Sequence, residues 1–90
     1  MNLYLVERTD DTHHDEYLCF LVASKTKALA RSYNPNEYSV VDTDRQIQPN
    51  KNYHAWVNYE KLDSLKVTYV GVAGNQYSEG DIIISSFDAG

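Results

Sequence analysis

The densest group of potential metal ligands in the chain is the segment from Asp10 to Glu16, which contains three aspartates, two histidines and a glutamate. Metal sites usually draw ligands from several elements at fixed spacing, for example two histidines one helical turn apart. Adjacent histidines on a turn cannot easily point at one ion. We therefore expect a solvated loop, with a small metal-dependent hydrolase or nuclease as the less favoured alternative.

The single cysteine, Cys19, is the other residue whose chemistry could suggest catalysis. A cysteine nucleophile needs a base, partial exposure and a lowered pKa. Cys19 lies within the most apolar run of the chain, and free cysteine is among the most buried residue types. Nothing in the sequence ties one of the three histidines to it. We predict that Cys19 is buried and inert.

No other catalytic motif is recognisable. The run from Gly71 to Gly74 lacks the later Gly, Lys and Ser/Thr of a phosphate-binding loop. Carboxylates facing each other across strands, such as Glu7 and Glu16, are usually solvated. The sequence therefore predicts a protein that is not an enzyme and that needs no metal or cofactor.

Aromatic residues are the more informative group, because the chain has eight tyrosines and one tryptophan. Tyr and Trp are enriched at interface hot spots, where they supply large contact area with a polar tip. They also fill the cores of small sheet domains, and the sequence leaves both roles open. We predict partner contacts in the irregular middle segment, with the acidic turn steering approach. The predicted partner-binding residues are Tyr38, Tyr53, Trp56, Tyr59, Asp10, Asp11 and Asp15.

Composition limits the class of partner. The net charge is −5, and the eight basic residues are scattered, which argues against nucleic acid and against anionic membranes. An acidic chain suits a host protein with a basic surface, and a homodimer is also left open. One cysteine allows no internal disulfide, and no apolar run approaches the roughly 20 residues that span a bilayer. We therefore expect a cytoplasmic protein.

The elements that must position these residues follow from the apolar pattern. Apolar runs over residues 2–7 and 17–23 predict two strands joined as an antiparallel hairpin, with the second strand central in the sheet. Ser24 is a candidate N-cap for a helix over residues 25–33, which Asn34-Pro35 would end. Later segments predict a helical turn and strands. The ranges are 38–42 (a short strand), 58–64 (the turn), 65–72 and 81–87 (strands).

This order predicts one domain over residues 1–90 with an α+β fold. We expect a small mixed, mainly antiparallel sheet of four to five strands, with one helix packed on a face.

Several short stretches resemble a family of small uncharacterised phage and prophage proteins. Those proteins have a "YDEYDSFVVAA" segment, an acidic "EEAR" helix ending near "HP", a "WV" pair and a final "ILASFNAG". The corresponding pieces here are HDEY at 14–17, FLVA at 20–23, Ala28 with Ala30-Arg31, Asn34-Pro35, Trp56-Val57 and GDIIISSFDAG at 80–90. The chain departs from the pattern at Leu18-Cys19 and at Lys25-Thr-Lys27. The resemblance implies phage origin and expression in the host cytoplasm, and it brings no catalytic residues.

These observations favour a non-catalytic phage or prophage accessory protein that binds and modulates a host protein, in the manner of an anti-CRISPR-type inhibitor of host defence. One alternative is a sponge for a nucleotide signal, which needs an aromatic pocket with converging basic groups such as Arg8, Arg31 or Arg45. Another is a structural phage protein.

Overall fold

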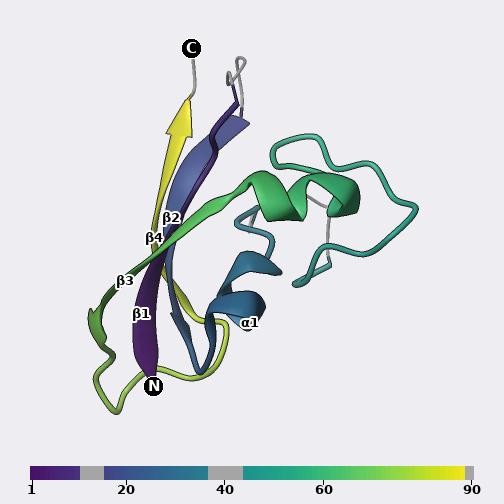
Figure 1. Cartoon of the computed structure of the whole chain (residues 1–90). Helices are drawn as coiled ribbons and strands as arrows, with labels where there is room; N and C mark the ends of the chain where they lie inside the picture. Colours follow the sequence, from purple (N-terminus) through teal and green to yellow (C-terminus); the bar gives the residue numbers. More distant parts are fainter. Residues whose placement is uncertain (11–15, 37–43, 89–90) are drawn as a thin grey trace.

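A computed structural model of the chain describes residues 1–10, 16–36 and 44–88 (Figure 1). Four strands form one antiparallel sheet: β1 (Asn2–Glu7), β2 (Glu16–Ser24), β3 (Lys66–Val72) and β4 (Ile82–Asp88). Their order across the sheet is β3-β1-β2-β4. The predicted strand over residues 38–42 lies outside the described residues.

The centre of the sheet is the β1–β2 hairpin, as the apolar runs predict. Leu5 of β1 is opposite Leu21 of β2, and both strands have a second neighbour on their outer side. A central strand offers both faces to other side chains, which explains why β2 is apolar at nearly every position. The predicted bounds of all four described strands agree with the observed bounds to within one residue.

The first helix is shorter than predicted. Helix α1 spans Lys27–Arg31, and its N-cap is Thr26, whose side chain accepts a hydrogen bond from the Leu29 N–H at 3.1 Å. The predicted cap, Ser24, is instead the last residue of β2. At the other end the Ser32 N–H bonds to the Leu29 carbonyl, and Tyr33 forms an isolated bridge with Gln46. The prediction was wrong because this bridge draws the chain away from helical geometry.

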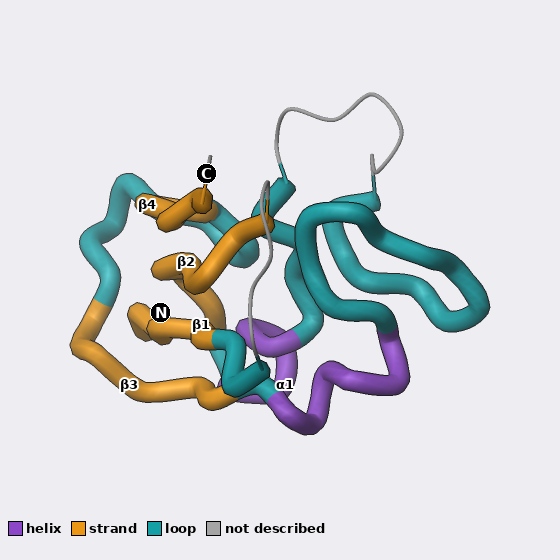
Figure 2. Tube along the Cα trace, turned by 90° about the horizontal axis from the view of Figure 1, so that it is seen from above, coloured by secondary structure: helices purple, strands orange, loops and turns teal. Residues whose placement is uncertain are grey.

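The second helical element, η1, is a 3-10 helix over Tyr59–Ser64, close to the predicted turn at 58–64. With two such short helices beside four strands, the part of the chain that the structure describes is mainly β with minor helix, which agrees with the α+β class at that level. In Figure 2 the strands form one row, and α1, η1 and the loop before η1 lie on the same side of it.

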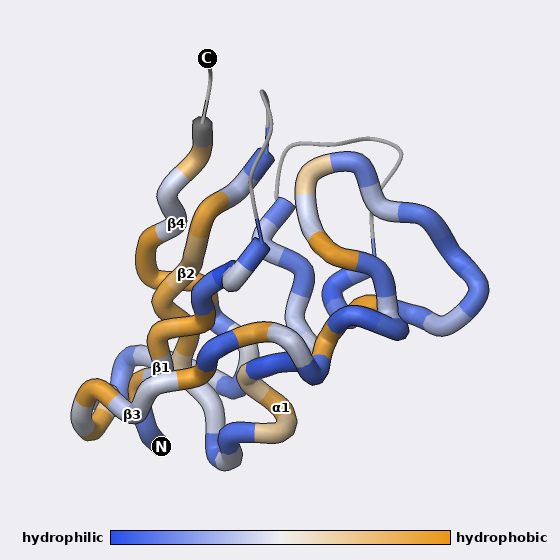
Figure 3. Tube along the Cα trace, turned by 45° about the horizontal axis from the view of Figure 1, so that its top comes forward, coloured by the Kyte–Doolittle hydropathy of each residue, from blue (hydrophilic) through white to orange (hydrophobic). Residues whose placement is uncertain are grey.

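The hydrophobic core lies on this side of the sheet. Val6 and Phe20 are completely buried, and the same cluster contains Ala30 of α1 and Trp56 of the loop before η1. Figure 3 shows apolar residues concentrated on the strands, while the loop before η1 carries mostly polar residues. A short buried stretch of that loop, Ala55-Trp56-Val57, therefore covers much of the hydrophobic core on this side of the sheet.

Among the described residues, neither helix is long and apolar enough to span a lipid bilayer.

Candidate partner-binding surface

Two of the aromatic residues predicted to contact a partner are buried. Tyr53 is 8% exposed and Trp56 is 2% exposed. The Trp56 ring packs edge-on against Phe20 with centroids 5.3 Å apart. The Tyr53 hydroxyl donates to Asp44 at 2.9 Å and accepts from the Gln48 N–H at 2.9 Å. The expectation that these two side chains belong to an exposed patch is wrong.

The reason is the small amount of helix. One five-residue helix cannot cover a four-stranded sheet, so large side chains of the irregular segment fill the remaining space. The sequence carries a signal for this burial that the prediction did not use. Trp56 stands between Ala55 and Val57, which are also buried, and an apolar run inside a polar loop indicates core contact.

Tyr59 keeps the predicted exposure. It is the first residue of η1 and is 49% exposed. Glu60 and Asp63 of the same helix are also exposed. Tyr38, Asp11 and Asp15 lie outside the described residues.

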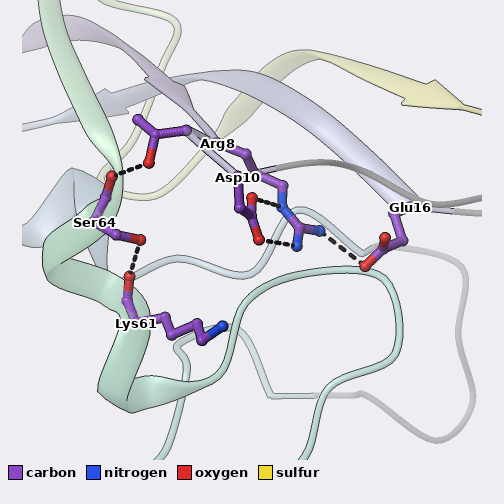
Figure 4. A network of polar contacts seen from close by, with 6 residues as sticks. Arg8, Asp10, Glu16, Lys61 and Ser64 are labelled. Carbon is purple, nitrogen blue, oxygen red and sulfur yellow. Dashed lines mark hydrogen bonds and ion pairs between the residues drawn. The ribbon is translucent and has the colours of Figure 1, made fainter.

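Arg8 organises the end of the sheet next to η1 (Figure 4). Its Nε and Nη2 donate to the two carboxylate oxygens of Asp10, each at 2.8 Å, and its Nη1 donates to Glu16 at 3.0 Å. The Arg8 side chain is only 7% exposed, and its guanidinium lies 5.8 Å from the Trp56 ring centroid. The arginine therefore links Asp10 and Glu16, the residues at the two ends of the acidic turn, and its guanidinium faces the ring of Trp56 in the core.

This geometry changes the role of Asp10. The hydrogen bonds from Arg8 hold the pKa of the Asp10 carboxyl below its usual range, and the same bonds raise the pKa of Arg8. Arg8 offsets one of the two carboxylates that it binds, so the group of Arg8, Asp10 and Glu16 keeps one net negative charge, and its long-range attraction is reduced. Asp10 is therefore a weaker candidate for steering a partner than predicted, and the other two aspartates of the prediction, Asp11 and Asp15, lie outside the described residues.

The residues that lead into the acidic turn and the end of η1 lie side by side. The Thr9 hydroxyl donates to the Ser64 carbonyl at 2.8 Å, and the Ser64 hydroxyl donates to the Lys61 carbonyl at 2.7 Å (Figure 4). The chain entering the turn is thus bonded to the last residue of η1, whose first residue is Tyr59. Exposed Thr9 and Asp10, which lead into the acidic turn, and η1, with Tyr59, Glu60 and Asp63, together form what we call the turn–η1 surface.

Cys19 is half-buried rather than fully buried. Burial raises the pKa of its thiol, and the negative charge of Glu7 on the neighbouring strand acts in the same direction. A raised pKa leaves little thiolate at neutral pH, which disfavours nucleophilic chemistry. Among the described residues no three His, Cys, Asp or Glu side chains gather to hold a metal ion. His13 and His14 of the predicted loop lie outside them.

Two of the three basic groups named for a nucleotide sponge, Arg8 and Arg45, are engaged in other contacts, whereas the buried Arg31 Nε has no hydrogen-bond partner among the described residues. Arg8 is bonded to two carboxylates, and the Arg45 guanidinium donates to the Gly80 carbonyl at 2.6 Å. Arg8 lies at the η1 end of β1, whereas Arg45 contacts the connection between β3 and β4. These two arginines do not converge on one ligand site.

The second face of the sheet is a feature that the sequence did not predict. Tyr4, Val6, Phe20 and Val22 point into the core, so the residues alternating with them point the other way. Register places their neighbours on the outer strands on the same face. We call this the open face; its members are Leu3, Leu5, Glu7, Cys19, Leu21, Lys66, Thr68, Ile84 and Ser86.

Alternation along residues 17–23 was the available signal, but these positions are apolar on both faces and so do not indicate which face is buried.

Comparisons with known proteins add no family: no protein-family model matches the chain, and no curated protein or solved structure matches it either.

Proposed function

We propose that this chain is a non-catalytic phage or prophage accessory protein that binds and modulates a host protein, in the manner of an anti-CRISPR-type inhibitor of host defence. The proposal rests on the resemblance to phage and prophage proteins, on the acidic composition and on the turn–η1 surface. In the proposed architecture, α1 and the irregular middle segment pack on one face of the sheet. The first residue of η1, Tyr59, is left free for contact.

The observation that carries the proposal is the position of Tyr59. It remains exposed while Tyr53 and Trp56, its neighbours in the middle segment, are buried. Glu60, Lys61 and Asp63 are exposed on the same helix, and the Thr9 hydroxyl, next to exposed Asp10, donates to the Ser64 carbonyl at the end of η1. A large amphipathic side chain on a helix that carries two carboxylates and one lysine suits a partner with a basic surface and an apolar recess.

The test begins with capture of host proteins on the immobilised chain, followed by titration of the purified partner. Tyr59→Ala should weaken binding by about 2 kcal/mol, because truncating a true anchor removes its buried contact area. The matched control is Tyr69→Ala on β3, since Tyr69 is similarly exposed at 55% and its recorded ring contact is with Tyr4 of β1. It should bind like the unchanged protein.

The charge contribution is tested separately with Asp11→Asn combined with Asp15→Asn. This variant should mainly slow association at low salt, because exposed charges accelerate encounter and are screened at high ionic strength. The surface is wrongly assigned if Tyr59→Ala and the double variant each change the binding of a verified partner by less than about threefold.

A further inference from the structure

We propose that the open face of the sheet is the contact between two copies of this chain, which pack face to face as a weak, reversible dimer. This inference is independent of the host-binding proposal, because the open face and the turn–η1 surface share no residue. It rests on the apolar row, the charge arrangement and the size of the face.

An apolar row crosses the open face from strand to strand. Leu5 is opposite Leu21, and Leu21 is opposite Ile84, so these side chains are neighbours on three adjacent strands. Ile84 is 65% exposed, and among the described residues no helix lies on this side of the sheet (Figure 2). Sheets with an apolar face commonly cover it by stacking on a second sheet.

The charges of the face favour a second copy over a basic partner. Glu7 and Lys66 are its two charged residues, and they are opposite each other on β1 and β3. Their opposite charges cancel, so the face carries no net charge, although the chain carries −5. A two-fold axis lets the same patch meet itself, so the Glu7 of each copy can approach the Lys66 of the other.

The size of the face sets the expected strength. Four strands spaced about 4.8 Å apart, each with six residues and a rise of about 3.3 Å per residue, give the face an area of roughly 400 Å². Stable interfaces usually bury about 800 Å² on each partner. The dimer is accordingly expected to form only at high protein concentration.

The outer edges of the sheet are less suited to joining copies. The pairing of β3 with β1 is irregular opposite Leu3 and Tyr4, and the pairing of β4 with β2 is irregular opposite Leu21 and Val22. Such bulges bend an outer strand and discourage the addition of another strand. Stacking of faces remains as the route to association.

The first measurement is sedimentation equilibrium of the whole chain from about 10 μM to about 1 mM. The mass should rise towards that of a dimer. Ile84→Lys should weaken dimerisation by about tenfold or more, since it places a charge in the apolar row. Ala28→Lys on α1, an exposed position on the other side of the sheet, is the control for one added positive charge and should leave the mass unchanged. Circular dichroism verifies that both variants fold.

A charge-reversal experiment identifies the occupant as a second copy. Glu7→Lys and Lys66→Glu each place like charges across the two-fold axis, so each variant alone should dimerise less than the unchanged chain. An equimolar mixture of the two variants should associate more strongly than either alone. An effect confined to folding within one chain cannot produce this recovery.

Cys19 gives an independent readout, because the only cysteine of the chain lies on the open face. Its rate of reaction with a bulky thiol reagent should fall as protein concentration rises. The proposal is overturned if the chain stays monomeric up to about 1 mM, if Ile84→Lys dimerises as well as the control, or if the mixture shows no recovery. None of these outcomes bears on host binding by Tyr59.

Discussion

Arg8 shows how a charged residue becomes part of a small core. Its guanidinium bonds to Asp10 and Glu16 on one side and faces the Trp56 ring on the other. A buried arginine is tolerated only when its donors are paired, because an unpaired buried charge is costly. The two carboxylates therefore have a structural role before any role in binding.

Asp10→Asn is expected to lower the free energy of unfolding by about 1 kcal/mol, because Arg8 loses a charged partner while keeping Glu16. The loss stays modest since the Asp10 side chain is 39% exposed and water screens the pair. Urea denaturation at neutral pH measures the change.

Asp63→Asn is the matched control, because Asp63 is an exposed aspartate on η1. It should leave stability unchanged within about 0.5 kcal/mol. Equal stability of the two variants would show that the Arg8–Asp10 pair contributes nothing to folding.

At the scale of elements, the connection from β3 to β4 depends on one glycine. Gly80 has φ of 86°, a region that favours glycine, and its N–H bonds to the Ala23 carbonyl at 2.8 Å. A Cβ atom at this position would lie 2.9 Å from the Tyr33 ring and 3.0 Å from the Arg45 guanidinium. The connection can therefore close over the end of β2 only with glycine here.

Gly80→Ala should destabilise the protein by about 2 kcal/mol or more, since it combines backbone strain with close contact to a buried ring. Thermal unfolding followed by circular dichroism gives the comparison. Gly71→Ala is the control, because a Cβ atom there meets nothing within 4 Å. Unchanged stability of Gly80→Ala would mean that the connection adopts another conformation.

The strands could be predicted from sequence because their signals are local. Residues 2–7 and 17–23 are apolar runs bounded by polar residues, and the structure places both at the centre of the sheet. The predicted helix is too long because the interaction that ends it is not local. Tyr33 pairs with Gln46, thirteen residues later, and local periodicity carries no information on such a contact.

The candidate surface was less predictable for the same reason. Whether a tyrosine is core or contact depends on which segments cover the sheet, and that is a property of the tertiary fold. Tyr53 and Tyr59 occur in the same polar segment, yet one is 8% and the other 49% exposed. The ion pair between Arg8 and Asp10 could not be predicted either, although the two residues are close in sequence. The sequence does not show which basic side chain bonds to this carboxylate.

At the scale of the whole molecule, one polar cluster joins three distant parts of the chain. The Tyr33 hydroxyl donates to Glu79 at 2.8 Å, Glu79 accepts from the Lys25 N–H at 2.7 Å, and Arg45 bonds to Gly80. Burial, with the hydrogen bond to Glu79, raises the pKa of Tyr33 to about 12. The cluster therefore requires a protonated Tyr33.

This requirement predicts a loss of stability at high pH. In the unfolded chain Tyr33 titrates near its ordinary pKa of 10.0, whereas in the folded protein it holds its proton up to about 12. The stabilisation is complete below pH 10 and is lost as pH rises towards 12, by roughly 2–3 kcal/mol in total. Urea denaturation across this range measures the slope.

Tyr33→Phe separates this residue from the other tyrosines and the lysines, which also titrate at high pH. The variant should lose stability less steeply between pH 10 and pH 12 than the unchanged protein. Identical slopes would show that Tyr33 does not hold its proton more tightly in the folded state.

The strand order also governs how the chain folds during synthesis. The central hairpin is made first, but both of its outer neighbours, β3 and β4, come from residues 66–88. A two-stranded hairpin alone is marginal in water, and pairing of strands so far apart in sequence is slow. The nascent chain thus exposes both edges of its most apolar strands until the last quarter of the domain leaves the ribosome. Slow translation of that region would prolong the exposure and favour capture by chaperones or aggregation.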